Sequence, residues 1–364
     1  MMHNNIQNKK VYNFGAGPSV LPPEVYNEAS SAVKEYKNSG MSILEISHRS
    51  DLFEEIILET TSLLRSLMKI PNDYYILFLQ GGGSQQFAMI PMNLLAVDET
   101  AYYIDSGVWA KRAQEESSKI GRSIILASSS SDNYNYIPKD YRIPDDASYL
   151  HITTNNTIYG TQWLNVPKTS IPLIADASSD ILSKEINITD YGLLYAGAQK
   201  NLGPAGVTLV IIKKDIIGKS KRILPKIFDY NEHVNAKSLY NTPPVFAIYV
   251  MLLNLRWLQK SGGVTYIEKL NFSKADLLYR ELDSNPLFIG HSVKEDRSIM
   301  NITFRITQPG LEKTFLETTT KHGIAGIKGY RSVGGFRVST YNAVPIENIQ
   351  YLVEIMKEFS AKFG

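Results

Sequence analysis

The chain of 364 residues is long enough for about two domains, and its 43% hydrophobic and 20% charged content is that of an ordinary globular protein, which excludes a disordered or fibrous chain. The formal net charge of +2 is too small for a protein built to coat nucleic acid or an anionic membrane, so we expect neither as a partner. The chain has no cysteine, which excludes disulfides, thiolate nucleophiles and cysteine-ligated metal sites, and the sequence predicts no other metal site.

The first ten residues are polar and lack the apolar segment of a secretory signal. The longest strongly apolar stretch, Val245 to Leu253, is far shorter than the roughly 20 residues that cross a bilayer. We therefore expect a cytoplasmic protein.

Short apolar runs recur through the middle of the chain and predict buried β-strands, because most of them lack alternating polar residues. These runs are Tyr74–Leu79, Ala101–Ile104, Ser123–Leu126, Tyr149–Ile152, Pro172–Ala175, Leu193–Ala196 and Val207–Ile212. Helix-like segments, such as Ser84–Leu95 and Val108–Ile120, separate several of them. Strands interleaved with helices favour an α/β domain with a mostly parallel sheet flanked by helices, and such sheets bind ligands at the carboxyl ends of their strands.

The pattern changes after Gly262 and Gly263. The segment 264–285 has the period of a long amphipathic helix, 300–306 and 335–340 alternate like half-buried strands, and Pro345 opens a final helix with an apolar stripe. The sequence thus predicts two domains: a large one over residues 16–263, and a smaller α+β domain over residues 264–364 that residues 1–15 complete.

Three glycine-containing segments invite a comparison with nucleotide-binding motifs. The pair Gly15 and Gly17, and the run from Gly218 to Ser220, fail the spacing of the dinucleotide and P-loop fingerprints. The run from Gly81 to Ser84 is better placed, since it follows a predicted strand and opens a predicted helix. Glycine amides there form a phosphate cradle, although an ordinary strand-to-helix turn explains the run equally well.

The most informative pair of residues is Asp176 and Lys200. Each follows a predicted strand, so both side chains can reach the same crevice at the edge of the sheet. Pyridoxal phosphate needs such a pair: a lysine for its Schiff base, and a carboxylate that keeps the pyridine nitrogen protonated. A structural ion pair is the alternative, and the small residues beside Lys200 count against it because a flat cofactor needs close approach to the backbone.

At these motifs the chain resembles the class V (fold type I) pyridoxal-phosphate-dependent aminotransferases, and in particular the branch that acts on phosphoserine. The matching stretches run in order over nearly the whole chain: Asn13–Pro18, Ile46–Ser50, Gln80–Ser84, Gly107–Ala110, Asn155–Gly160, Ala175–Asp180, Gly197–Asn201, Tyr240–Pro244 and Gly329–Arg337. The resemblance implies the fold type I architecture and the cofactor pyridoxal 5′-phosphate.

The resemblance also assigns a role to individual residues. Lys200 would carry the cofactor and shuttle a proton, and Asp176 would pair with the pyridinium nitrogen. The remaining cofactor contacts would come from the ring-stacking Trp109 and from Gly83, Ser84, Thr157 and Gln199, together with Asn241 and Thr242 of a neighbouring subunit in a homodimer with shared active sites.

The substrates implied by the resemblance carry at least two negative charges: phosphoserine, 3-phosphohydroxypyruvate, glutamate and 2-oxoglutarate. Such ligands call for several cations in one pocket, and arginine binds carboxylate or phosphate through two hydrogen bonds. The matching positions are His48, Arg49, Tyr330, Arg331 and Arg337. Many family members have histidine in place of Tyr330, and some have arginine in place of Ser84, so affinity for the phosphate or distal carboxylate is expected to differ here.

The implied reaction is a ping-pong amino transfer in serine biosynthesis, with a second substrate in vitamin B6 biosynthesis in many bacteria. An alanine–glyoxylate type aminotransferase is the enzymatic alternative, but its small substrates need fewer cations. A cysteine desulfurase is excluded because the chain has no cysteine to accept the sulfur. A phosphate-binding protein without catalysis is a further alternative, against which the Asp176 and Lys200 pair argues.

Overall fold

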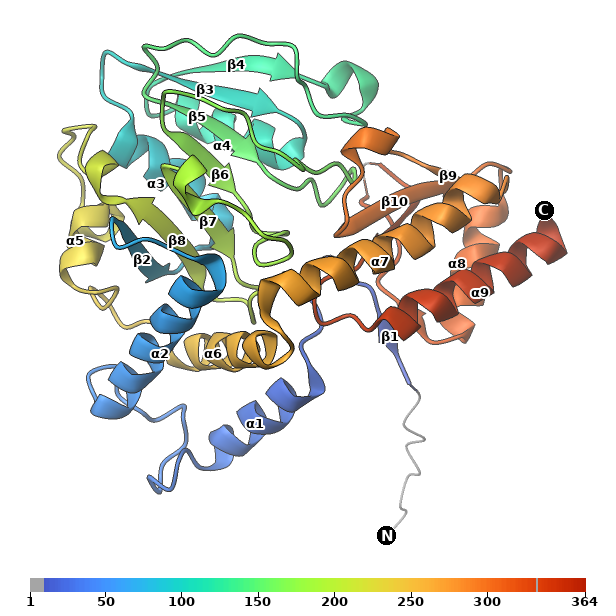
Figure 1. The fold of residues 1–364 in the computed structure, drawn as a ribbon, viewed down its shortest axis with the longest axis horizontal. Helices are drawn as coiled ribbons and strands as arrows, with labels where there is room; N and C mark the ends of the chain where they lie inside the picture. Colours follow the sequence, from blue (N-terminus) through green and yellow to red (C-terminus); the bar gives the residue numbers. More distant parts are fainter. Residues whose placement is uncertain (1–9, 332) are drawn as a thin grey trace.

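The computed structural model describes residues 10–331 and 333–364. The polar N-terminal segment 1–9 and Ser332, which falls in the last of the matching stretches, lie outside the described residues. The chain forms a large body of sheet and helices, with a smaller lobe beside it that contains the C-terminus (Figure 1).

The large body is built on one central sheet. Its strands are β2 (Tyr74–Leu79), β3 (Thr100–Asp105), β4 (Arg122–Ser128), β5 (Tyr149–Thr153), β6 (Leu173–Asp176), β7 (Leu193–Gly197) and β8 (Thr208–Lys213). Within the described part of the chain the sheet has seven strands in the order β2-β8-β7-β6-β5-β3-β4. All run in one direction except β8, which is antiparallel to both of its neighbours. The predicted α/β fold with a mostly parallel sheet is confirmed.

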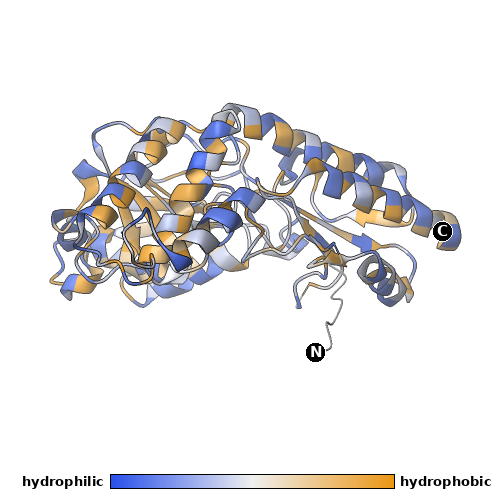
Figure 2. Ribbon diagram, turned by 90° about the horizontal axis from the view of Figure 1, so that it is seen from below, coloured by the Kyte–Doolittle hydropathy of each residue, from blue (hydrophilic) through white to orange (hydrophobic). Residues whose placement is uncertain are grey.

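Helices cover both faces of this sheet, which explains why its central strands lack polar alternation. The helices of the large body are α1 (Pro23–Lys34), which packs on α6, and α2 (Asp51–Met68), α3 (Gly82–Leu94), α4 (Val108–Ser118), α5 (Tyr230–Asn235) and α6 (Val245–Lys260). Successive strand residues alternate between two cores: Ala175 packs in the core shared with α2 and α6, and Ile174 in the core shared with α3. Figure 2 shows the apolar strands enclosed by helices whose outer faces are hydrophilic.

The smaller lobe has its own sheets and core. Its elements are β1 (Tyr12–Asn13), α7 (Gly263–Ser284), β9 (Phe288–Gly290), β10 (Asn301–Ile306), α8 (Leu311–Lys321), β11 (Ile324–Ala325), β12 (Phe336–Ser339) and α9 (Ile346–Phe363). Strands β12, β10 and β9 form an antiparallel sheet, and β1 pairs with β11 in parallel. Pro345 is the residue just before α9 rather than its first helical residue, a shift of one position from the prediction.

The long helix α7 joins the two bodies (Figure 1). Its first turns, with Val264 and Ile267, pack in the core of the large body, while Ala275 and Leu278 pack in the core of the lobe. Because one helix contributes to both cores, the division of the chain at residue 263/264 stays a proposal.

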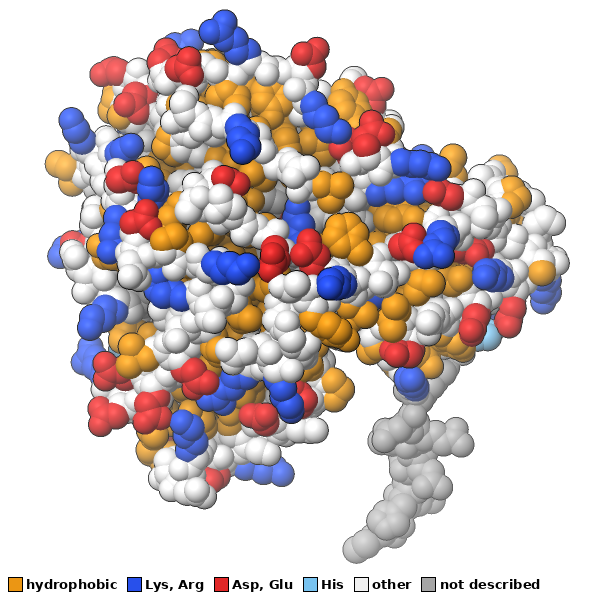
Figure 3. Space-filling model, in the orientation of Figure 1, with side chains coloured by type: hydrophobic (Ala, Val, Ile, Leu, Met, Phe, Trp, Pro, Cys, Tyr) orange, Lys and Arg blue, Asp and Glu red, His pale blue; other side chains and the backbone are white. Residues whose placement is uncertain are grey.

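The surface in Figure 3 shows acidic and basic side chains interspersed, with hydrophobic side chains in small groups between them. None of the helices within residues 10–331 and 333–364 combines the length and the apolar character that a membrane-spanning helix needs.

One buried histidine, His151, predicts that the stability of the fold decreases at acidic pH. His151 on β5 is 1% exposed, its ring stacks on that of Tyr103 with centroids 4.9 Å apart, and its Nε2 lies 3.0 Å from the hydroxyl of Tyr195. Burial lowers the pKa of His151 from 6.5 to about 3, so the folded protein keeps this ring neutral at pH values where the unfolded chain binds a proton. The stabilisation is therefore complete above pH 6.5 and falls on acidification, by about 2 kcal/mol by pH 5.

Urea unfolding at a series of pH values tests this expectation. His151→Gln should flatten the dependence of the unfolding free energy on pH below 6.5. An unaltered slope in His151→Gln would assign the acid sensitivity to other groups.

Candidate active site

The carboxyl edge of the large sheet brings together segments that are far apart in the sequence. Strands β2, β3, β5, β6 and β7 all end there because they share one direction. Asp176 is the last residue of β6, and Lys200 lies three residues after the end of β7. Thr157 follows β5, Trp109 lies in the first turn of α4 after β3, and Gly83 lies in the first turn of α3 after β2.

Lys200 contacts Thr157 and lies near Trp109, two residues that the family resemblance predicts at the cofactor. Its Nζ donates a hydrogen bond to Thr157 Oγ1 at 3.0 Å and lies 5.9 Å from the centre of the Trp109 ring. Burial lowers the pKa of Lys200, and the charge of Arg337 lowers it further, while Asp176 opposes this effect. A neutral, nucleophilic amine is therefore easier to form here than at a surface lysine.

An N-terminal segment covers the turn that carries Lys200. A Cβ placed on Gly17 would lie 3.1 Å from Lys200 Cγ, and the φ of Gly17 is +130°, so this position favours glycine. The backbone N–H of Ser19 donates to the carbonyl of Gln199 at 3.0 Å, and the Ser19 hydroxyl donates to the carbonyl of Lys200. The glycines that fail the dinucleotide fingerprint thus allow a close backbone approach beside Lys200.

Asp176 is 6% exposed and its two carboxylate oxygens have different surroundings. Oδ1 accepts hydrogen bonds from the backbone N–H of Ser178 at 2.9 Å and from the Ser178 hydroxyl at 2.6 Å. Among the described residues none donates to Oδ2, which lies 3.8 Å from the position that a Cβ on Gly83 would take. The missing side chain of Gly83 leaves space beside Oδ2.

The first turn of α3, which contains Gly83, borders this space. Gly81 precedes the helix with a φ of +84°, a conformation that favours glycine, and Gly82, Gly83 and Ser84 are the first helical residues. Their N–H groups have no acceptor within the helix, so they can donate to an anion.

The turn that carries Thr157 is fixed by its own side chains. The side chain of Asn156 donates to the carbonyl of Ser106 at 2.6 Å and accepts from the N–H groups of Ile158 and Tyr159 at 3.2 and 3.3 Å. Arg337 on β12 donates from Nη1 to the carbonyl of Thr157 at 3.3 Å, which places a cation of the lobe against this turn.

The charge state of Arg337 follows from its partial burial. Burial lowers the pKa of its guanidinium, although arginine stays protonated in proteins near neutral pH. Its Nε is buried and has no hydrogen-bond partner among the described residues, so Arg337 retains capacity to donate to a ligand.

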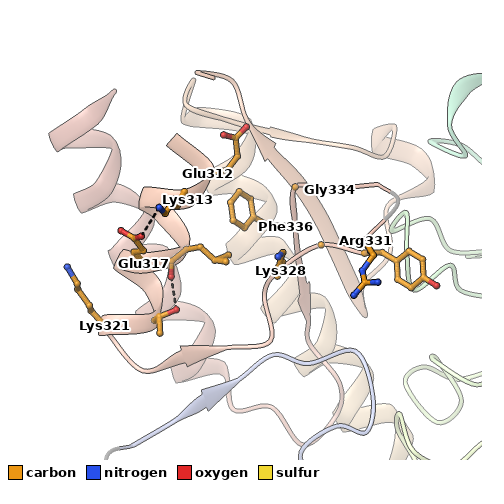
Figure 4. A pocket seen from close by; sticks show the side chains of 13 residues that line it. Glu312, Lys313, Glu317, Lys321, Lys328, Arg331, Gly334 and Phe336 are labelled. Atoms are coloured by element: carbon orange, nitrogen blue, oxygen red, sulfur yellow. Dashed lines mark hydrogen bonds and ion pairs between the residues drawn. The ribbon is translucent and has the colours of Figure 1, made fainter. Parts of the chain in front are cut away.

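The loop before β12 holds two further predicted residues. Tyr330 packs beside Trp109 against the apolar cluster of Tyr134, Ile158 and Tyr159. Arg331 is exposed and lines a hollow of about 900 Å³ between this loop and α8. Figure 4 shows Arg331 at the end of the hollow opposite Lys313 and Lys321 of α8.

A second group of predicted residues lies elsewhere on the same chain. His48 and Thr242 line a separate shallow hollow of about 490 Å³, and Arg49 and Asn241 beside them are exposed. The carbonyl of Thr242 accepts a hydrogen bond from Gln80 Nε2 at 2.8 Å. None of these four residues shares a described hydrogen bond or ion pair with Lys200, Asp176 or Arg337.

Ser178 was missed by the sequence analysis. It lies in the matching stretch Ala175–Asp180, and its position two residues after an acidic strand end is a signal for a side chain that bonds back to that acid. The structure shows two hydrogen bonds of this kind, both to Asp176 Oδ1.

The comparisons with known proteins identify the family of the chain. The family model described as aminotransferase class-V matches residues 11–352. The phosphoserine aminotransferase of Flavobacterium johnsoniae is 51% identical over 354 residues, which are 97% of this chain and 99% of that protein.

Two solved structures extend the similarity to the fold. The phosphoserine aminotransferase from Bacillus circulans subsp. alkalophilus superposes with a TM-score of 0.95 at 44% identity, over 98% of this chain and 99% of that one. The PLP-bound phosphoserine aminotransferase from Trichomonas vaginalis gives a TM-score of 0.91 at 35% identity, over 96% of this chain and 100% of that one. The chain therefore belongs to the class-V aminotransferase family, and within it to the phosphoserine aminotransferases.

Proposed function

We propose that this chain catalyses the reversible transfer of an amino group between O-phospho-L-serine and 2-oxoglutarate, giving 3-phosphohydroxypyruvate and L-glutamate, with pyridoxal 5′-phosphate as cofactor. The observation that carries the proposal is the meeting of Lys200, Asp176 and the open first turn of α3 at one edge of the sheet. The 51% identity to a phosphoserine aminotransferase over nearly the full length supports the choice of substrate. We place this reaction in the cytoplasm, as a step of serine biosynthesis.

The residues at the sheet edge fit pyridoxal phosphate. Beside Gly83 the structure leaves space where a Cβ would approach Asp176 Oδ2 to 3.8 Å and the hydroxyl of Ser178 to 3.7 Å. The N–H groups of Gly83 and Ser84, with Gln199, would hold the phosphate, and Trp109 and Thr157 would flank the ring. When bound, the cofactor supplies an electron sink for the α-carbon of the amino acid.

Each residue has a defined task in this proposal. Lys200 would hold the cofactor covalently, and its Nζ would remove and return the proton at the substrate α-carbon. Asp176 would supply the negative charge that keeps the ring nitrogen protonated. Arg337 would bind the α-carboxylate that all amino-acid and keto-acid substrates share, because it is the cation that contacts the Thr157 turn.

We further propose that the active enzyme is a homodimer with shared sites. Asn241, Thr242, His48 and Arg49 share no described hydrogen bond or ion pair with Lys200 of their own chain, and the exposed apolar side chains of Leu44 and Tyr240 lie near them in the sequence. An isologous dimer that covers this surface would bring Asn241 and Thr242 to the phosphate site of the second subunit.

Hybrid dimers test this arrangement. Asn241→Asp, which places a negative charge near the phosphate, and Lys200→Ala should each be inactive alone, and mixing the two chains after unfolding and refolding should recover activity. Asn231→Asp, at an exposed asparagine of α5, is the matched control and should be active alone. Absence of recovery, or a fully active monomer in sedimentation at assay concentrations, would contradict shared sites.

A survey of amino donors tests the activity itself. Phosphoserine or glutamate, added to purified protein loaded with pyridoxal phosphate, should convert the bound cofactor, and this conversion is observed as loss of the visible absorbance. Alanine and serine should react poorly. Rapid conversion by alanine with glyoxylate as acceptor would favour the alanine–glyoxylate alternative. Reaction with 4-phosphohydroxythreonine decides whether the vitamin B6 route is served.

The arginine positions predict how substrates are distinguished. Arg337→Ala should lower kcat/KM for every substrate, since the α-carboxylate is common to all. Arg49→Ala and Arg331→Ala should lower kcat/KM for phosphoserine and glutamate but change that for alanine little. Where bound substrate buries the charge pair, loss of one partner costs about 2–5 kcal/mol, roughly 30-fold to several thousand-fold in kcat/KM.

Two controls accompany this series. Arg305→Ala removes an exposed arginine of β10 beside Arg337's strand and should leave all substrates unchanged. Tyr330→Phe should cost much less than either distal arginine substitution, because it removes one hydrogen-bonding hydroxyl and leaves every cation in place. Equal losses for phosphoserine and alanine in Arg49→Ala and Arg331→Ala would overturn the distal assignment.

A further inference from the structure

We propose that Ser178 is a positioning residue for Asp176: it holds one carboxylate oxygen so that the other is presented to the cofactor. The inference rests on the role of Asp176 in the proposed function. It is carried by the hydrogen bonds around Ser178, which the proposed function does not use.

The two hydrogen bonds of the Ser178 hydroxyl determine the direction in which its proton points. Its Oγ lies 3.0 Å from the backbone nitrogen of Gly197, which can only donate, so Oγ accepts there. The hydroxyl proton is then free for the bond to Asp176 Oδ1 at 2.6 Å, and the N–H of Ser178 donates to the same oxygen at 2.9 Å. Two donors therefore converge on Oδ1, and a rotation of the carboxylate would break both bonds.

The residue that donates to the Ser178 hydroxyl, Gly197, lies close to Lys200 in the sequence. Gly197 ends β7, three residues before Lys200. Ser178 thus links the carboxylate of Asp176 to the end of the strand that precedes Lys200, which restrains the position of Asp176 relative to the turn that carries Lys200. Ser178 is 7% exposed, so water does not compete strongly for these bonds.

The second carboxylate oxygen of Asp176, Oδ2, lies next to the first turn of α3. A Cβ on Gly83 would lie 3.8 Å from Asp176 Oδ2 and 3.7 Å from Cε2 of Tyr195, so the tyrosine ring borders the same space. The hydroxyl of Tyr195 is held 3.0 Å from His151 Nε2, which restrains that ring. With Oδ1 occupied, Oδ2 is the acceptor that remains for a protonated ring nitrogen.

Ser179 provides a matched control for loss of a buried hydroxyl. It is 2% exposed, accepts a hydrogen bond from Asn155 Nδ2 at 2.8 Å and donates to the carbonyl of Asn155 at 3.0 Å. It has no hydrogen bond to Asp176, so Ser179→Ala removes a comparable group without changing the carboxylate's donors.

The experiment compares the affinity of the cofactor-free protein for two ligands. One is pyridoxal phosphate, and the other is its analogue with a CH group in place of the ring nitrogen, which cannot bond to Asp176. Ser178→Ala should weaken binding of pyridoxal phosphate roughly five- to thirtyfold and binding of the analogue little, since one charge-assisted hydrogen bond is lost. Ser178→Thr, which keeps the hydroxyl, should restore the ratio of the two affinities, and Ser179→Ala should leave that ratio as in the wild type.

The outcomes separate this inference from the proposed function. Equal weakening for both ligands in Ser178→Ala, or a lower unfolding temperature with an unchanged affinity ratio, would overturn the positioning role. Ser178→Cys, which keeps a weak donor at the same position, carries the same test if the alanine variant does not fold. Asp176→Asn should abolish the preference for pyridoxal phosphate, and an unchanged ratio in that variant would overturn the proposed role of Asp176 itself.

Discussion

Replacement of Lys200 by alanine is expected to abolish turnover, with a loss of at least about 10⁴-fold in kcat, because in the proposed function one amine would serve both as the covalent anchor and as the proton carrier. The variant should still bind pyridoxal phosphate non-covalently through the α3 cradle. Borohydride reduction followed by peptide mapping should place the cofactor on the peptide of Lys200 in the wild type and on no peptide in Lys200→Ala.

Two other lysines also have lowered pKa values and serve as internal controls for this test. Lys274 is fully buried and burial lowers its pKa to about 7, while Lys184 is partly buried with a pKa that burial also lowers. Lys274 donates to the carbonyls of Thr340 and Tyr341, both at 2.8 Å, so its amine is occupied and inaccessible. A low pKa therefore does not select the reactive lysine by itself, and access at the sheet edge distinguishes Lys200. Label on Lys274 or Lys184 would contradict the assignment.

Asp176→Asn is the second change with a large expected effect, a fall in kcat of about 10²–10³-fold. The asparagine can keep its oxygen in place of Oδ1, where Ser178 donates twice, but its amide nitrogen then replaces Oδ2. A negative acceptor becomes a neutral donor, so the ring nitrogen loses the charge that stabilises its proton. Steady-state kinetics with phosphoserine and 2-oxoglutarate measure the loss, and the unfolding temperature should stay near that of the wild type.

The neighbouring acid Asp180 is the control for this substitution. It is buried, accepts hydrogen bonds from Thr154 and from Gln162, the latter at 3.1 Å, and burial raises its pKa. Asp180→Asn should lower stability more than kcat, because these partners lie in the protein interior. Near-normal turnover in Asp176→Asn would mean that another group protonates or stabilises the ring nitrogen.

The sequence determined the elements of the large body because a strand buried on both faces must be apolar throughout. Each predicted run between Tyr74 and Ile212 coincides with a strand to within two residues at either end. It also determined that Asp176 and Lys200 share an edge, since both follow strands of one parallel sheet. The order of the strands, and the reversal of β8, could not be deduced, because several orders bury the same apolar residues.

The tertiary structure decided which predicted residues meet within one chain. Arg337 reaches the Thr157 turn from β12, and Gly17 reaches Lys200 from the N-terminal segment, through contacts between residues some 180 positions apart. His48 and Thr242, by contrast, line a separate hollow, a grouping that the spacing of residues along the chain does not predict. The hydrogen bonds of Ser178 likewise depend on where β7 lies beside β6. The order of residues determines which chemical groups lie near each other along the chain. The distances between remote segments are set only when the folded chain buries its apolar faces and pairs its buried polar groups.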